Sequence, residues 1–180
     1  SAGIGKETAK ELARRNARVI LACRNQDKAR LAARDILHDT GKQVVCMQLD
    51  LCSFKSVRRF ARDLLEREDR LDVLINNAGI MRKLTLSVLS RPCIESVHEG
   101  VNELRHRSRR VMLTDLLKKS APSRVINLSS ILHHIGSTAH LHDKATGNHP
   151  WTHPVLVYSN TKMAMLVFSR ALAAKLKPHG

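Results

Sequence analysis

The stretch LDVLINNAG, residues 71–79, decides the fold class. Residues 71–76 form a short apolar run, which is typical of a strand buried on both faces of a sheet. The next residues, Asn77, Ala78 and Gly79, are small or favour turns, so the strand should end there. Small side chains at this point would let a flat ligand pass over the sheet edge, although Asn is also common in ordinary turns. A strand covered on both faces needs helices on both sides, so strands and helices should alternate along the chain.

The rest of the sequence does alternate in this way. Short apolar runs predict strands at residues 17–23, 43–49 and 124–128. Apolar residues at spacings of three and four predict helices at residues 5–16, 26–41, 53–68, 111–119 and 158–176. Ser53 should cap one of these helices, and Gly41 should end another. We therefore predict an α/β fold with a Rossmann-type doubly wound parallel sheet, formed by residues 1–180 as a single domain.

The charge of the chain raises one alternative function. The 180 residues carry a net charge of +15, and the segment RHRSRR at residues 105–110 is the densest basic cluster. Such a surplus is common in proteins that bind nucleic acid or acidic membranes. Only 3% of the residues are aromatic, which argues against a platform on which bases stack. A basic nucleic-acid-binding protein therefore stays a minor alternative, and no nucleic-acid partner is expected.

Ligands of a parallel sheet bind outside the carboxyl ends of its strands, so the residues at those ends are candidates for a site. Gly3, Ile4 and Gly5 precede the first helix, where backbone N–H groups attract a phosphate; an ordinary glycine-rich helix start would look the same. Arg24 follows the first predicted strand, where an acidic residue would bind the ribose of NAD. An arginine there suits the 2′-phosphate of NADP, so NADP(H) is favoured over NAD(H), with a solvated arginine as the alternative.

Two further strand ends carry polar residues. Asp50 and Leu51 follow the second predicted strand, where the carboxylate would accept from an adenine amino group or serve as a turn residue ahead of Ser53. Ser129 and Ser130 follow the fourth, where a hydroxyl would hold a substrate carbonyl oxygen or cap a loop. Both pairs fit a site at the carboxyl edge of the sheet.

The segment YSNTK places Tyr158 and Lys162 four residues apart on a predicted helix, so their side chains share one face. A free phenol has a pKa near 10 and is a poor base at neutral pH. A nearby ammonium group favours the phenolate, which makes general acid–base chemistry feasible. Taken alone, the spacing is more often one solvated turn of a helix.

In this order along the chain, the motifs SAGIG, NNAG, INLSS and YSNTK resemble those of the short-chain dehydrogenase/reductase family. The longer phrases VILACRN, LDVLINNAGIM and KKSAPSRVINLSS are similar to its retinol dehydrogenase branch. The resemblance implies an NADP(H)-dependent oxidoreductase that interconverts an alcohol and a carbonyl by hydride transfer, on small retinoid-like or other lipophilic substrates. Tyr158 would be the proton donor and acceptor, Lys162 would favour the phenolate and bind the nicotinamide ribose, and Ser130 would bind the substrate oxygen. The implied cofactor contacts are Gly3, Ile4, Gly5, Arg24, Asp50, Leu51, Asn77, Ala78, Gly79, Tyr158 and Lys162.

The same resemblance implies that the sequence is truncated at both ends, with the first strand and the C-terminal strands outside it. A membrane anchor could then precede it, although no run within it approaches about 18 apolar residues. The four cysteines form no Cys-x-x-Cys pair, so they should be reduced thiols in an intracellular compartment. That compartment is the cytoplasm or the surface of the endoplasmic reticulum or mitochondrion, and the oligomeric state stays open.

Residues 83–110 depart from the family pattern. Asn102 matches the asparagine that the family links to its lysine through water, and it is a further candidate catalytic residue. Arginines then occupy positions where buried apolar residues are expected, and unpaired buried charges are costly. These are Arg105, Arg107, Arg109 and Arg110. One hypothesis is that part of this segment is misread or frameshifted. If the segment is genuine, we expect a poorly packed helix and a weak or inactive enzyme. The alternative function is a catalytically impaired Rossmann-fold binding protein of the same family.

The predicted loop at residues 131–154 is rich in histidine, which raises the question of a metal site. Its histidines are His133, His134, His140, His142, His149 and His153. Asp143 is its one nearby carboxylate, and the family chemistry needs no metal, so no metal is expected. The loop should instead lie on the substrate side, with Trp151 touching a lipophilic ligand.

Overall fold

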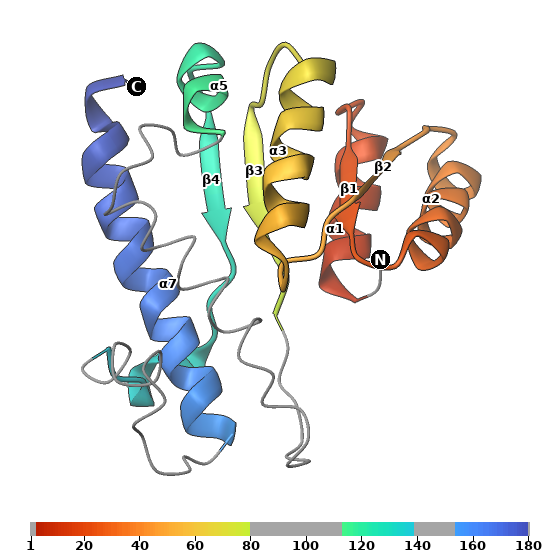
Figure 1. The fold of residues 1–180 in the computed structure, drawn as a ribbon. Coiled ribbons are helices and arrows are strands. Elements are labelled where there is room, and N and C mark those ends of the chain that lie inside the picture. Colours follow the sequence, from red (N-terminus) through yellow and green to blue (C-terminus); the bar gives the residue numbers. More distant parts are fainter. Residues whose placement is uncertain (1–2, 80–112, 139–153, 180) are drawn as a thin grey trace. The chain divides into compact units, whose positions relative to one another are not determined.

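Helices and parallel strands alternate along the chain in the computed structural model, which describes residues 3–79, 113–138 and 154–179 (Figure 1). The elements are α1 (Ile4–Arg14), β1 (Ile20–Cys23), α2 (Gln26–Thr40), β2 (Val45–Gln48), α3 (Phe54–Arg67), β3 (Val73–Asn76), α5 (Thr114–Lys119), β4 (Arg124–Asn127), the 3₁₀ helix η2 (Ile131–Ile135), α7 (Pro154–Leu176) and the 3₁₀ helix η3 (Lys177–His179). The described chain divides into two compact units, Ser1–Arg67 and Glu68–Gly180. Each unit contains one pair of parallel strands.

The first unit packs α1 and α2 against the pair β1–β2. Ile20 lies opposite Val45 in the parallel register. The core cluster is small and rich in alanine, and its members are Ala9, Ala13, Leu21, Ala32 and Ile36. Alanine lets a helix approach a neighbouring element closely, because it has almost no side chain to accommodate. Ion pairs from Lys6 to Asp35 and from Lys10 to Asp39 join α1 to α2 at the surface.

The helix ends of the first unit follow the sequence signals. Gly41 ends α2 in the left-handed conformation, with φ 66°, as predicted. Ser53 accepts a hydrogen bond from the Ser56 N–H at 3.3 Å ahead of α3, as expected for a cap. The apolar stripe of α3 is only partly inward: Leu64 is buried, but Leu65 is 47% exposed.

The second unit joins β3, β4 and α7 through side chains. Val73 pairs with Arg124 and Asn76 with Asn127 in the parallel register. The Asn76 side chain donates to Asn127 Oδ1 at 2.7 Å, and Asn127 Nδ2 donates to Ser169 Oγ on α7 at 2.8 Å. This chain of hydrogen bonds fixes how α7 lies along β4.

Two elements of the second unit differ from the prediction. Helix α7 begins at Pro154, four residues before the predicted start at Tyr158 (158 − 154 = 4). Proline is favoured in the first turn of a helix, since the N–H it lacks would have no partner there. Residues Ile131–Ile135, predicted as loop, form the 3₁₀ helix η2. Ser130 caps η2 by accepting from the Leu132 N–H at 3.3 Å.

The strands form two separate two-stranded ladders within the part of the chain that the structure describes, where one continuous sheet was expected. All pairings are parallel, as predicted. The cysteines also differ in part: Cys23 and Cys46 form no disulfide, but Cys52 is disulfide-bonded, so the expectation of reduced thiols is wrong at Cys52. Among the described helices, none combines the length and apolar character that crossing a membrane requires.

Candidate active site

Tyr158 and Lys162 lie one turn apart on α7. The Lys162 ammonium is 5.5 Å from the centroid of the Tyr158 ring. Its Nζ donates to the main-chain oxygen of Leu128, just beyond β4, at 2.8 Å. Lys162 is only 7% exposed, and it forms no ion pair with a carboxylate of the described residues. Lysine is almost never buried unless it is paired, so a stability argument alone does not account for it here.

The segment after β3 meets this lysine. A Cβ added to Gly79 would lie 3.3 Å from Lys162 Nζ, so only glycine leaves the ammonium its full space. Asn77 is half-buried, while Ala78 and Gly79 are exposed. The structure therefore brings two sequence motifs, NNAG and YSNTK, into contact at the carboxyl ends of β3 and β4.

The two serines after β4 have different surroundings. Ser129 Oγ donates its hydrogen to the main-chain oxygen of Lys162 at 3.1 Å. Ser130 Oγ accepts from the Leu132 N–H, and a hydroxyl that accepts still has its own O–H to donate. Ser130 can therefore donate to a carbonyl oxygen without breaking this contact, whereas Ser129 would have to release α7.

In the other unit, Gly3, Ile4 and Gly5 lie at the amino end of the eleven-residue helix α1. Gly3 has φ 61°, a conformation that favours glycine, and its oxygen accepts from Lys6 N–H at 3.0 Å. Ile4 is 71% exposed and Gly5 lies in the first turn. The positive end of the helix dipole and these accessible N–H groups are suited to an anion.

Arg24 follows β1 with an exposed side chain and forms no ion pair with the described residues. Its main-chain oxygen accepts from Gln48 Nε2 at 3.0 Å, which holds the backbone in place. The nearest acid in sequence, Asp27, pairs with Arg30 at 2.8 Å. Among the described residues, the Arg24 guanidinium therefore has no carboxylate partner at the end of β1.

Asp50 takes part in a turn. Its Oδ1 accepts from the Cys52 N–H at 3.0 Å, and its own N–H donates to Ser56 Oγ at 2.9 Å. This geometry supports the turn role that was one of the two readings of Asp50. Leu51 beside it is 38% exposed.

Several candidates lie outside the described residues: Asn102, the four arginines that follow it, Asp143, Trp151 and the histidines His140, His142, His149 and His153. Of the described histidines, His133 stacks on His134 with ring centroids 4.0 Å apart, and its Nδ1 lies 2.6 Å from the Ser130 oxygen. No group of three or more metal-binding side chains occurs in the ranges that the structure describes.

Two partners of the motif residues were not foreseen. One is the Leu128 main-chain oxygen, which no side-chain pattern can indicate. The other is Asn160, the middle residue of YSNTK, whose Oδ1 accepts from the Ser137 N–H at 2.8 Å. Asparagine is a poor helix former, and its place inside an otherwise helical motif was the only signal available.

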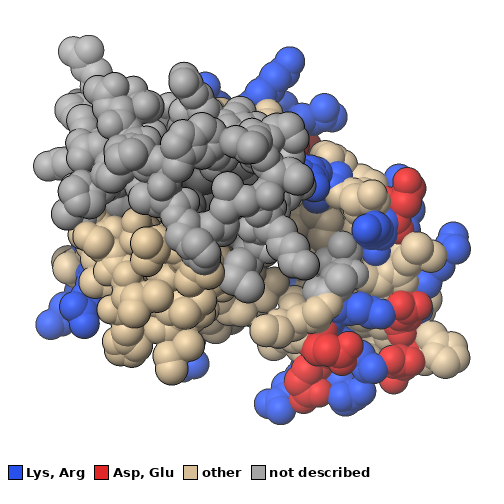
Figure 2. Space-filling view, turned by 90° about the horizontal axis from the view of Figure 1, so that it is seen from below, with Lys and Arg blue, Asp and Glu red and all other residues tan. Residues whose placement is uncertain are grey.

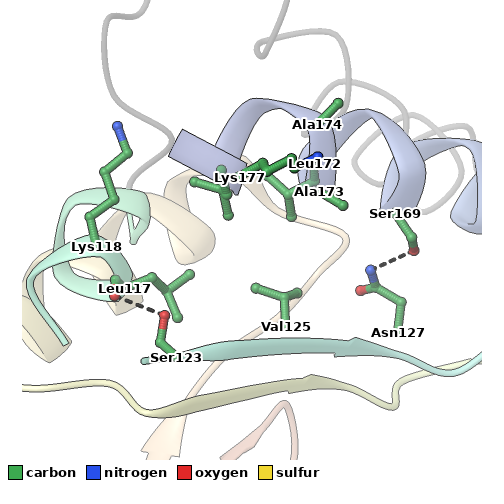
Figure 3. A pocket seen from close by; sticks show the side chains of 11 residues that line it. Leu117, Lys118, Ser123, Val125, Asn127, Ser169, Leu172, Ala173, Ala174 and Lys177 are labelled. Carbon is green, nitrogen blue, oxygen red and sulfur yellow. Dashed lines mark hydrogen bonds between the residues drawn. The ribbon is translucent and has the colours of Figure 1, made fainter. Parts of the chain in front are cut away.

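One cavity among the described residues lies away from this site. It has a volume of about 450 Å³ and lies along β4 between α5 and the second half of α7 (Figure 3). Leu117, Val125 and Leu172 line it, and the hydrogen bond from Asn127 to Ser169 borders it. It contains none of Ser130, Tyr158 and Lys162, so its size gives no reason to move the candidate site.

Acidic and basic side chains are mixed on part of the described surface. On the face drawn in Figure 2, acidic side chains lie among basic ones. Ion pairs such as Arg14 with Glu11 and Arg30 with Asp27 account for part of this mixing. The dense basic segment at residues 105–110 lies outside the described part of the chain.

Helices and strands alternate along the chain and both strand pairs are parallel, which places the protein in the doubly wound α/β class of fold. The family model for short chain dehydrogenases matches residues 1–142, and the chain belongs to this oxidoreductase family. It is 46% identical over 180 residues to retinol dehydrogenase 11 of Mus musculus. The matched region covers 99% of this chain and 55% of that relative. It is 41% identical over 182 residues to retinol dehydrogenase 13 of Homo sapiens, and this match covers 99% of this chain and 53% of that relative. The chain thus spans about half the length of these relatives.

Solved structures agree with the Rossmann-type fold. A putative uncharacterized protein from Mycobacterium paratuberculosis matches with a TM-score of 0.68 and 33% identity, over 98% of this chain and 60% of that one. A putative short chain dehydrogenase from Escherichia coli CFT073, solved in complex with NADPH, matches with a TM-score of 0.70 and 26% identity, over 98% and 68%. The α/β fold class predicted from the sequence is confirmed.

Proposed function

We propose that the full-length protein is an NADP(H)-dependent oxidoreductase that interconverts an alcohol and a carbonyl group on lipophilic, retinoid-like substrates. The observation that carries this proposal is the buried Lys162 ammonium beside Tyr158, with no carboxylate partner in the described chain. A protein keeps such a costly charge where function requires it.

Each unit by itself offers groups suited to part of a nicotinamide dinucleotide. In the first unit, Gly3 opens a helix whose amino end suits a phosphate, and Arg24, which has no carboxylate partner among the described residues, suits a 2′-phosphate. In the second unit, Gly79 leaves space against Lys162. Bound NADP(H) would supply the hydride that is exchanged with the substrate carbon. The protein side chains would hold the substrate and move its proton.

Tyr158 would pass the proton between its phenol oxygen and the substrate oxygen. Lys162 would favour the phenolate by its charge, and it would donate a second hydrogen bond to the nicotinamide ribose while Leu128 holds the first. Ser130 would donate its O–H to the substrate oxygen and so orient the carbonyl. Asn102 would join this group by the water link that the family resemblance implies. We also propose that the protein is intracellular, either in the cytoplasm or associated with a membrane.

The first test is a cofactor titration followed by protein fluorescence with the full-length protein. NADPH should bind and NADH should bind at least tenfold more weakly. Arg24→Ala should weaken NADPH binding by roughly 10- to 100-fold, which is the scale of one charge-assisted pair, and leave NADH binding unchanged. Arg34→Ala, an exposed arginine on α2, is the matched control and should change neither. Equal affinity for NADPH and NADH would contradict the assignment of Arg24.

The second test is turnover of all-trans-retinal with NADPH. Tyr158→Phe should lower kcat by at least 100-fold while the Kd for NADPH stays within about threefold, because only the proton transfer is lost. Full activity of Tyr158→Phe would refute the mechanism. A wild type that binds neither NADPH nor NADH would instead support the alternative of a catalytically impaired binding protein.

A further inference from the structure

Gly136, just beyond η2, is packed directly against the turn of α7 that carries Tyr158 and Lys162. A Cβ at this position would lie 2.4 Å from the main-chain oxygen of Ser159 and 2.8 Å from Cβ of Met163. Real Cβ atoms essentially never come within 3.0 Å of such atoms, and the clash is with backbone, which no side-chain rotation relieves. Its φ of −81° is ordinary, so the requirement for glycine is a close approach and not a backbone conformation.

The α7 side of this contact is closely packed. Ser159 is fully buried, and its hydroxyl donates to the Val155 oxygen at 2.6 Å within the helix. Because Ser159 lies between the two motif residues along the chain, a movement of this turn moves them too. The clash would therefore have to be relieved by shifting the segment that contains Ser130, or by shifting the Tyr158–Lys162 turn.

Three hydrogen bonds complete the attachment on either side of Ser130. Upstream, the Leu128 oxygen accepts from Lys162 Nζ, and Ser129 Oγ donates to the Lys162 oxygen. Downstream, the Ser137 N–H donates to Asn160 Oδ1 at 2.8 Å, directly after Gly136. The segment that carries Ser130 is thus held to the same helical turn before and after η2.

We propose that Gly136 and Asn160 are positioning residues, which set the place of the Ser130 hydroxyl relative to Tyr158 by attaching the end of η2 to α7. This inference rests on the proposed oxidoreductase function for its effect on catalysis. Neither residue touches a reacting atom in this scheme; both act through the placement of Ser130. The requirement for glycine is steric, since any Cβ meets the helix backbone.

The size of the effect follows from the clash. Restoring an ordinary contact of 3.4 Å from 2.4 Å needs a shift of about 1.0 Å (3.4 − 2.4 = 1.0). A misplacement of about 1 Å at a reacting centre can lower a rate by about 100-fold. Loss of the Asn160 hydrogen bond alone should allow a smaller shift, with kcat lowered about tenfold.

The experiment uses the full-length protein with NADPH and all-trans-retinal. Gly136→Ala should lower kcat by about 100-fold, and Asn160→Ala by about tenfold, with the Kd for NADPH within about threefold of wild type in both. A residue that only supported stability would lower the folded fraction and leave kcat per folded molecule unchanged. Gly41→Ala is the control for general destabilisation, because it strains a positive φ in the other unit while its Cβ meets nothing within 4 Å. It should lower the melting temperature and leave kcat unchanged.

Hydrogen exchange separates this proposal from the proposed function. In Gly136→Ala and in Asn160→Ala, the Ser137 amide should exchange at least tenfold faster than in wild type, while amides in the middle of α7 stay protected. Unchanged exchange at Ser137 in both variants would overturn the attachment, whether or not the wild type turns over substrate. If the wild type shows no turnover but the variants show this exchange pattern, the proposed enzymatic function is rejected and the attachment of η2 to α7 is retained. Full kcat in both variants of an active enzyme would overturn the positioning role.

Discussion

Replacement of the buried Lys162 by methionine separates a functional lysine from a structural one. The change removes one charge-assisted hydrogen bond to Leu128, which is worth about 1.5–3 kcal/mol. It also removes a 7%-exposed ammonium, whose burial costs several kcal/mol when no carboxylate compensates it. The second effect is at least as large as the first. We therefore expect the free energy of unfolding of Lys162→Met to be unchanged or higher by up to about 2 kcal/mol.

The assay measures stability and activity on the same samples of full-length protein without cofactor. The melting temperature should stay equal or rise, by at most about 2–4 °C for each kcal/mol, because the shift per kcal/mol becomes smaller as a chain becomes longer. Meanwhile kcat/KM for all-trans-retinal should fall by at least 100-fold, because Tyr158 loses the charge that favours its phenolate. Lys175→Met, at an exposed position on the same helix, should alter neither quantity appreciably. A fall of more than about 5 °C in Lys162→Met, with kcat/KM retained, would refute the reasoning.

Two further predictions concern stability. Hydrogen bonding to Lys10 holds the pKa of Asp39 at about 2, below its ordinary value of 3.8, so the folded state gains stability from this carboxylate above about pH 4 and loses it as pH falls towards 2. Asp39→Asn should therefore melt below wild type at neutral pH in thermal denaturation, and the difference should shrink between pH 4 and pH 2; a constant difference would contradict the pairing. Asn127→Leu should cost about 1–2 kcal/mol in urea unfolding, because it removes hydrogen bonds to Asn76 and Ser169 of about 1 kcal/mol each, partly offset by water in the adjoining cavity. In a double-mutant cycle with Ser169→Ala the two costs should fall short of additivity by at least 0.5 kcal/mol, and strict additivity would count against the bond.

The sequence was most informative where one local signal determined an element. Apolar runs located β1 and β3, and Gly41 and Ser53 marked helix ends through capping, which depends on neighbouring residues alone. The start of α7 was missed because Pro154 follows a polar segment and resembles a loop end, although proline is also favoured in a first helical turn. When one residue, such as this proline, fits both a loop end and a helix start, the sequence alone cannot decide between the two.

The site shows the same division. The spacing of Tyr158 and Lys162 predicted a shared helical face, and the Lys162 ammonium lies 5.5 Å from the ring. The sequence could not decide which of Ser129 and Ser130 has a hydroxyl available to a substrate. The two differ in a tertiary contact, since the Ser129 hydroxyl donates to α7 and the Ser130 hydroxyl does not. The contact of Gly136 with Ser159 could not be predicted either, since it depends on how closely two elements approach and the φ of Gly136 is unexceptional.

The two separate strand ladders have a consequence for handling the polypeptide. Within its own unit, each strand of the described ranges is hydrogen-bonded to a neighbour strand on one side only. Amide and carbonyl groups along an unpaired strand edge are templates on which another chain can add a strand. We therefore expect a preparation of these 180 residues alone to associate edge to edge as its protein concentration rises.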